Sequence, residues 1–202
     1  MDLTPIDLGA LTDEPLPSDV SSFLVEADSR IRTFLRSSPA NSVPAFHPSD
    51  HVTAYRALCR LDRLGYSIDP LCEWGCGFGV VTGLGAKLGV DAYGIEIEPE
   101  LVGEAQQLLL DFEIVAEIIE GSFIPRSYGD MENWSDPDFN TIQDGTDAYD
   151  DLGLEIRDFD LVYAYPWPGE EEMYFELFER YGAPGSILLM YHGVEEMLAF
   201  RK

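Results

Sequence analysis

The stretch CEWGCGFGVVTGLGAKLGVDAYGIEIEP, residues 72–99, decides the fold of this chain. It opens with an acidic residue and three glycines at alternate positions, which are Glu73, Gly75, Gly77 and Gly79. Glycines at this spacing allow positive φ angles and a close approach of the backbone to a ligand, before the next helix begins. The pattern therefore predicts a strand, a tight turn and a helix, which together are typical of a site for a nucleoside-bearing molecule.

A second carboxylate follows at the end of the next apolar run. Glu96 lies 17 residues after Gly79, within the run 92–97. In doubly wound folds an acidic side chain at an offset of ~20 residues meets the hydroxyl pair of a ribose. We therefore expect Glu96 to bind a ribose.

The spacing of the glycines separates two classes of cofactor. A dinucleotide fingerprint requires Gly-x-Gly-x-x-Gly, but the sixth position is Val80 counted from Gly75 and Thr82 counted from Gly77. Because neither register completes the motif, a nicotinamide-dependent oxidoreductase is the less favoured alternative.

The Glu73-x-Gly75-x-Gly77-x-Gly79 motif resembles the first motif of class I S-adenosylmethionine-dependent methyltransferases, Asp/Glu-x-Gly-x-Gly-x-Gly. The resemblance covers residues 46–191 and implies S-adenosylmethionine as the cofactor. This molecule carries an amino group, a sulfonium and a carboxylate but no phosphate, so a carboxylate beside the turn has a cation to meet. Glu73 suits that role, and Cys76 lies among the residues of the turn that the resemblance assigns to the cofactor.

Two further stretches add cofactor contacts through the resemblance. Gly121-Ser122-Phe123 stands where methyltransferases often have Gly-Asp-Ala/Phe, so Ser122 would bond the adenine amino group while Ile97 and Phe123 give apolar contact. The phrase 46–50, FHPSD, resembles one that precedes the first strand in a subset including the Dot-like lysine methyltransferases. It implies that Phe46 and Ser49 lie near the methionine moiety, and helix capping explains Ser49 equally well.

The segment YAYPWPGE, residues 163–170, follows the fourth expected strand, where open α/β sheets bind ligands. It loosely resembles the Asp/Asn-Pro-Pro-Tyr/Phe motif of amino-group methyltransferases. Tyr165 offers a hydroxyl, Trp167 a ring for stacking or cation contact, and Glu170 a carboxylate that could bind or deprotonate an amine. These three are the candidate catalytic residues, with core packing of Trp167 and helix capping by Glu170 as alternatives.

The rest of the chain predicts an α/β, Rossmann-like, mostly parallel sheet with helices on both faces and further helices at the N-terminal end. Apolar periodicity indicates helices beginning at Ser18 or Asp19, at Ser49 or Asp50, at Val80, at Pro99 and at Glu170. Strands are expected at 71–72, 92–97, 114–119, 159–165 and 187–191. Only eleven residues follow Tyr191, so we expect a sheet abbreviated at the C-terminal end, although 195–201 could add one short strand.

One domain, residues 18–202, accounts for this pattern, with the N-terminal helices in 18–66. Residues 1–17 are expected to form an extended, flexible arm or a disordered tail. The acidic and aromatic insertion 125–157 is either a substrate lid, with contact area from Trp134, Phe139 and Tyr149, or disordered.

The net charge of the chain disfavours some classes of binding partner. The chain has 38 acidic and 12 basic residues, and its formal net charge of −26 repels nucleic acids and anionic membranes. A small molecule or a basic peptide fits better, although the charge could also serve solubility or reflect a salt-rich habitat. With no signal peptide or run of ~18 apolar residues, we expect a soluble, cytoplasmic protein, a monomer or weak dimer. The three cysteines have a spacing typical of neither a zinc site nor a redox pair, so we expect reduced thiols. His47 and His51 lie four residues apart, but no carboxylate-rich ligand set completes a metal site, so we expect no metal.

The favoured hypothesis is a methyltransferase that uses S-adenosylmethionine to methylate an amine or other nucleophile on a small molecule or a protein. In such a transfer, positioning of the acceptor carries most of the catalysis. The alternative from a different class is a regulatory or scaffold protein that binds the cofactor without catalysis.

Overall fold

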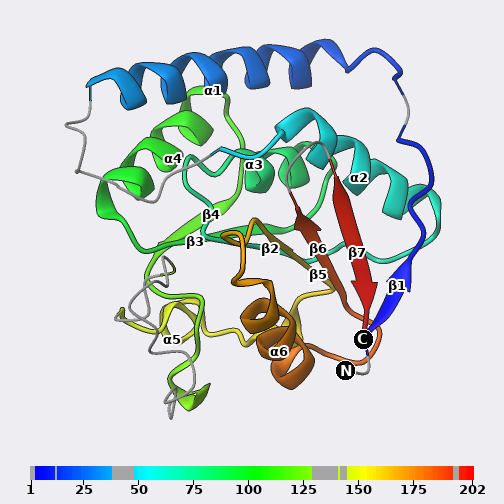
Figure 1. Cartoon of the computed structure of the whole chain (residues 1–202). Coiled ribbons are helices and arrows are strands. Elements are labelled where there is room, and N and C mark those ends of the chain that lie inside the picture. Colours follow the sequence, from blue (N-terminus) through cyan, green and yellow to red (C-terminus); the bar gives the residue numbers. More distant parts are fainter. Residues whose placement is uncertain (1–2, 12, 38–47, 129–140, 142–144, 193–195) are drawn as a thin grey trace.

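The structure is a computed structural model that describes residues 3–11, 13–37, 48–128, 141, 145–192 and 196–202 (Figure 1). Within these residues seven strands form one sheet in the order β1-β7-β6-β5-β2-β3-β4. The strands β4, β3, β2, β5 and β6 pair in parallel, and β7 is antiparallel to β6 and to β1. Their bounds are Thr4–Ile6 (β1), Leu71–Trp74 (β2), Ala92–Glu96 (β3), Glu117–Glu120 (β4), Leu161–Ala164 (β5), Ile187–Tyr191 (β6) and Met197–Arg201 (β7).

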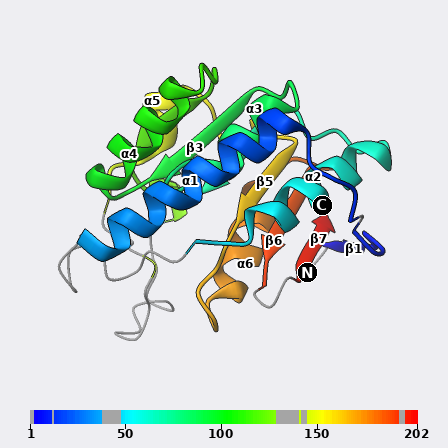
Figure 2. The same ribbon diagram turned by 90° about the horizontal axis from the view of Figure 1, so that it is seen from above.

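Helices cover both faces of this sheet, which confirms the predicted Rossmann-like fold. The helices α1, α2, α3 and α4 lie on one face, and α5 and α6 lie on the other (Figures 1 and 2). The helix bounds are Ser18–Ser37 (α1), His51–Arg63 (α2), Val80–Lys87 (α3), Pro99–Asp111 (α4), Ala148–Leu152 (α5) and Glu171–Tyr181 (α6), with short 3-10 turns at Arg126–Tyr128 and Ile156–Asp158. None of the described helices is long and apolar enough to cross a membrane.

Local side-chain and backbone chemistry explains where α2 and α4 begin. The Asp50 carboxylate accepts hydrogen bonds from the backbone N–H groups of Val52 and Thr53, at 3.0 and 3.1 Å, and so caps α2. Pro99 opens α4, because its fixed φ suits the first helical turn. These starts hold α2 and α4 beside the carboxyl ends of the central strands.

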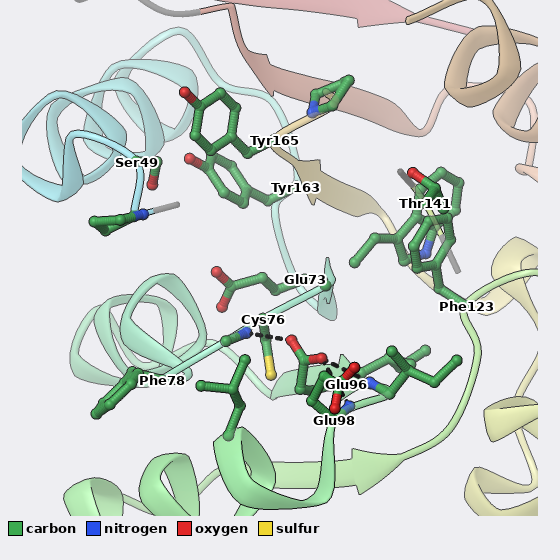
Figure 3. Close-up of a pocket in the computed structure, with 18 of the residues that line it drawn as sticks. Ser49, Glu73, Cys76, Phe78, Glu96, Glu98, Phe123, Thr141, Tyr163 and Tyr165 are labelled. Atoms are coloured by element: carbon green, nitrogen blue, oxygen red, sulfur yellow. Dashed lines mark hydrogen bonds between the residues drawn. The ribbon is translucent and has the colours of Figure 1, made fainter. Parts of the chain in front are cut away.

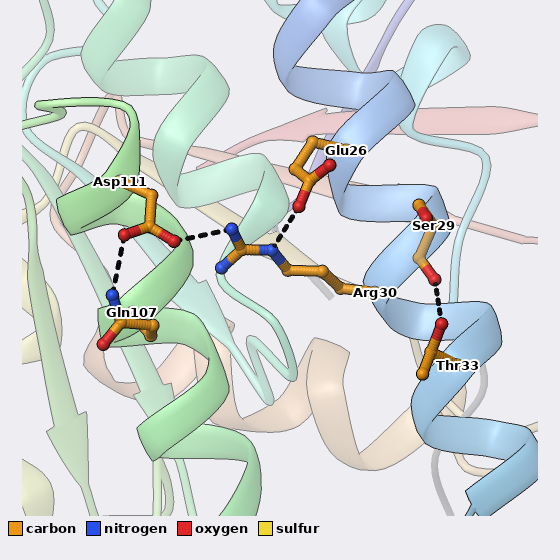
Figure 4. Close-up of polar contacts among 6 residues, drawn as sticks. All are labelled: Glu26, Ser29, Arg30, Thr33, Gln107 and Asp111. Atoms are coloured by element: carbon orange, nitrogen blue, oxygen red, sulfur yellow. Dashed lines mark hydrogen bonds and ion pairs between the residues drawn. The ribbon is translucent and has the colours of Figure 1, made fainter.

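The long helix α1 packs its apolar face on α3 and α4, as its periodicity predicts. Its buried side chains are Val20, Phe23, Leu24, Ala27, Ile31 and Phe34. Arg30 adds a polar link, since its Nε lies 2.8 Å from Glu26 and its Nη2 lies 2.6 Å from Asp111 on α4 (Figure 4). Because partly exposed ion pairs contribute ~1 kcal/mol or less, the apolar face supplies most of the docking energy.

Two helical glycines give a paired test of this packing. A Cβ at Gly83 on α3 would lie 2.6 Å from Phe23 and 2.9 Å from Leu109, whereas a Cβ at Gly103 on α4 would meet nothing within 4 Å. We expect Gly83→Ala to lower the free energy of unfolding by ~1–3 kcal/mol through overpacking. Gly103→Ala should raise it by ~1 kcal/mol through helix propensity. Urea denaturation of both variants checks this, and a shift of the same sign in both would contradict the packing described here.

The N-terminal and C-terminal strands pair at one margin of the sheet, which corrects the expectation of a flexible N-terminal arm. Residues 4–6 are not a free arm, because β1 pairs with β7 through Thr4–Arg201, Pro5–Phe200 and Ile6–Ala199, and Leu8 is buried. At the C-terminal end, β7 is the only described strand that follows β6, which confirms the short strand expected within 195–201. The outermost strand beyond β7 is β1, from the N-terminal end.

One described residue of the insertion 125–157, Tyr149, was expected to contact a substrate. Tyr149, on α5, is only 6% exposed and packs in the core with Trp74 and Ile124, so its predicted contact with a substrate is wrong. The Asp147 carboxylate accepts a hydrogen bond from the Tyr149 N–H and caps this helix. Trp134 and Phe139 lie outside the described residues.

Candidate functional site

A cavity of about 580 Å³ opens at the carboxyl ends of the parallel strands (Figure 3). The loops that follow β2, β3, β4 and β5 line it, together with the start of α2 and Ile31 of α1. Its volume falls within the ~300–1,000 Å³ of typical small-molecule sites. Ligands of open α/β sheets bind at this edge.

The glycine turn forms the floor of the cavity. Gly75, Gly77 and Gly79 have φ angles of 67°, 53° and 63°, which confirms the positive φ expected of this turn. Gly75 and Gly77 line the cavity, but Gly79 does not. A Cβ at Gly79 would lie 3.0 Å from Ile118, so this glycine allows the turn to pack on β4, and its assignment to the cofactor is corrected.

Glu96 connects the glycine turn to the end of β3. One carboxylate oxygen accepts from the Gly77 N–H at 2.7 Å, and the other accepts from Ile97 and Glu98, at 2.8 and 3.0 Å. Burial raises the pKa of Glu96, and these three N–H groups oppose the increase. The side chain thus shapes the turn and also presents its carboxylate to the cavity.

Glu73 points into the cavity from the end of β2 and is 5% exposed. Its Oε2 accepts from the backbone N–H and the hydroxyl of Thr82, at 2.7 and 2.6 Å. Burial raises the pKa of Glu73 to about 8, against the lowering effect of Thr82. A cation in the cavity would favour the ionised form, which burial alone disfavours.

An aromatic wall closes one side of the cavity. The Trp74 and Phe123 rings stack with centroids 5.2 Å apart and an interplanar angle of 10°, and Tyr174 lies 5.4 Å from Phe123. The Thr141 hydroxyl, which also lines the cavity, donates to Glu170 and lies 3.2 Å from the Tyr174 hydroxyl. Such a wall suits a flat, apolar ring system.

The side of the cavity next to the start of α2 carries hydroxyl groups. Tyr163 and Tyr165 extend from the end of β5 toward Ser49, which precedes α2 (Figure 3). Burial raises the pKa of Tyr163 and of Tyr165, so both hydroxyls keep their protons at neutral pH. Trp167 is half-buried and also lines the cavity.

His51, the first residue of α2, lines the same side of the cavity. Burial lowers its pKa to about 4, although Asp50 and Asp28 favour its charged form. The imidazole is therefore neutral at pH 7. Among the described residues no group of three or more His, Cys, Asp or Glu side chains is placed to hold a metal ion.

Most of the predicted site residues come together in this one cavity. Those that line it are Ser49, Glu73, Gly75, Cys76, Gly77, Glu96, Ile97, Ser122, Phe123, Tyr165 and Trp167. Ser122 is almost fully buried, and its hydroxyl accepts from the Ile124 N–H at 3.1 Å. Phe46 lies outside the described residues.

Glu170 is not among the lining residues, which corrects its assignment as a catalytic residue. The side chain is 4% exposed, and its carboxylate accepts from the N–H and the hydroxyl of Thr141. It therefore holds Thr141 in the wall and does not line the cavity.

Sequence reasoning missed several lining residues, including Tyr163, His51, Glu98 and Thr141. Strand alternation could have indicated Tyr163, because Tyr163 and Tyr165 are two apart on the expected strand 159–165 and would point to the same face. His51 adjoins the phrase that contains Ser49. No local pattern indicates Thr141, which reaches the cavity from a distant part of the chain.

Comparison with known proteins adds a finding about the fold. No family model matches the chain, and no curated protein matches it by sequence. A methyltransferase from Geobacter sulfurreducens has a similar structure, with 14% identity and a TM-score of 0.54, over 94% of this chain and 93% of that one. An O-methyltransferase from Bacillus cereus, crystallised in complex with SAH, matches with 14% identity and a TM-score of 0.51, over 89% of this chain and 68% of that one.

Both similarities extend over most of this chain. At such low identity they establish the architecture alone. The chain therefore has the fold of the class I S-adenosylmethionine-dependent methyltransferases, as its glycine-turn motif implied.

Proposed function

We propose that this protein is a methyltransferase that uses S-adenosylmethionine. One observation carries the proposal: the glycine turn, Glu73 and Glu96 meet in a single cavity at the carboxyl edge of the sheet. The structural similarity to methyltransferases supports the same function. When bound, the cofactor supplies an electrophilic methyl group on a sulfonium.

The residues of the cavity fit the parts of this cofactor. Glu73 would meet the amino group, and Glu96 would bind the ribose hydroxyls, because carboxylates accept strongly from both kinds of donor. The aromatic wall around Phe123, with Ile97 and Ser122, would take the adenine. Tyr163, Tyr165 and Ser49 would orient the methionine end and the acceptor, since methyl transfer depends on alignment of the acceptor.

The charge of the cavity favours an amine as the acceptor, on a small molecule or a basic peptide. Glu73, Glu96 and Glu98 line it, and none of the 12 lysines and arginines does. A phosphate or carboxylate acceptor would find no cationic side chain to offset the loss of its hydration. Nucleic acids are therefore disfavoured, which agrees with the net charge of −26.

Calorimetry with S-adenosylmethionine, S-adenosylhomocysteine and NAD tests the cofactor. We expect binding of both adenosyl ligands and none of NAD, whose two phosphates would enter an acidic cavity. Transfer of a labelled methyl group to a panel of amines, peptides and metabolites then tests catalysis. Binding without transfer would favour the regulatory or scaffold alternative, and binding of NAD alone would refute the proposal.

Replacing Glu96 tests its role at the ribose. We expect Glu96→Ala to weaken binding of S-adenosylmethionine by ~1–3 kcal/mol, because charged hydrogen bonds to the ribose and the support of the Gly77 N–H are both lost. Glu120→Ala is the matched control, since Glu120 ends the neighbouring strand β4 in register with Glu96 and is exposed. Calorimetry measures both, and equal affinities in the two variants would refute the assignment.

A further inference from the structure

The cavity is lined by carboxylates without a compensating cation. Glu73, Glu96 and Glu98 face it from the ends of β2 and β3 (Figure 3). All 12 lysines and arginines lie in the described part of the chain, and none of them lines the cavity. The stretches outside the described residues contain no lysine or arginine, so they cannot bring one to this site.

Two of the basic side chains form ion pairs elsewhere on the protein. Arg30 pairs with Glu26 and Asp111, and Lys87 lies 3.1 Å from Asp19. The remaining acidic excess gives the whole chain a net charge of −26. Both the local carboxylates and the long-range field therefore make the cavity favourable for positive charge.

The proposed cofactor and its product differ in charge by one unit. S-adenosylmethionine has a net charge of one positive unit, whereas S-adenosylhomocysteine is neutral overall. On transfer the S–CH₃ bond breaks and its electron pair stays on sulfur, which loses its charge. The methyl group bonds to the lone pair of the acceptor, whose proton leaves to water. The two ligands are otherwise almost identical in shape.

We propose that this cavity discriminates between the two ligands by their charge and binds S-adenosylmethionine more tightly than S-adenosylhomocysteine. This inference rests on the proposed function. The product would then dissociate readily, because the reaction removes the charge that the carboxylates attract. Coulomb attraction inside a partly enclosed cavity is stronger than in bulk water and weakens with added salt. The discrimination should therefore depend on ionic strength.

Calorimetry of the full chain at pH 7 tests the proposal with the two ligands at low and high salt. We expect S-adenosylmethionine to bind at least about tenfold more tightly at low salt, and the ratio to fall as salt is added. Glu98→Gln should lower this ratio by about threefold or more. Glu176→Gln, an exposed site on α6, is the matched control and should leave the ratio unchanged.

Equal affinities of the two ligands, or tighter binding of S-adenosylhomocysteine, would overturn the proposal while leaving the proposed function intact. A ratio that falls as much in Glu176→Gln as in Glu98→Gln would also overturn it, because the lining carboxylates would then have no special part. If neither ligand binds, the proposed function fails and this inference fails with it.

Discussion

Replacing Glu73 with glutamine should stabilise the ligand-free protein, and the gain should grow with pH. Burial raises the pKa of Glu73 from 4.5 to about 8. Between these values the unfolded chain loses a proton that the folded protein keeps, so the stability of the wild type falls as pH rises. The difference from Glu73→Gln should widen by about 1.4 kcal/mol per pH unit, to roughly 5 kcal/mol above pH 8, and vanish below pH 4.5.

Urea denaturation of both proteins from pH 4.5 to 9 measures this difference. A glutamine oxygen can still accept from the N–H and hydroxyl of Thr82, so the local bonds survive the substitution. The exposed Glu176→Gln removes the same charge and should show no such widening. Parallel pH profiles for the wild type and Glu73→Gln would show that burial of this carboxyl does not cost stability. The proposed function also requires Glu73→Gln to bind S-adenosylmethionine less tightly.

Truncation of Leu8 should destabilise the protein by ~2–4 kcal/mol, because this side chain is 7% exposed and anchors the segment that follows β1. It packs with Leu58, Leu61 and Ala199, which belong to α2 and β7. Leu110→Ala removes the same atoms at a site that is 69% exposed on α4, and its effect should stay within ~0.5 kcal/mol. Thermal or urea unfolding compares the two. Equal small effects would mean that residues 4–8 contribute little to the fold.

Much of the fold was predictable because its signals are local. The glycine turn, Pro99 and the Asp50 cap each fix a boundary through their own backbone or side chain, and β6 spans Ile187–Tyr191 as expected. The strand β1 was not predictable. It has three residues, of which Thr4 and Pro5 are exposed, so it shows no apolar alternation, and only β7 makes it a strand.

Some residues of the candidate site were likewise predictable from the sequence, and others were not. The Glu73 and Glu96 positions follow from a motif and its spacing, since each lies at or next to the end of a strand beside the turn. Glu170 was misassigned because closeness in sequence to Trp167 does not determine where a buried carboxylate points. In the structure this carboxylate accepts hydrogen bonds from Thr141 and does not line the cavity. Thr141 comes from a segment remote in sequence, so only the tertiary structure brings it to the cavity.

The pairing of β1 with β7 has a kinetic consequence. Thr4 and Arg201 are partners although nearly the whole chain separates them, so closing this edge carries the largest loop entropy in the sheet. Contacts of such long range form late during folding and tend to open first. Amide protons at this margin should therefore exchange with solvent earlier than those of the central parallel strands, and a transient opening here would leave the cavity at the far side of β5 undisturbed.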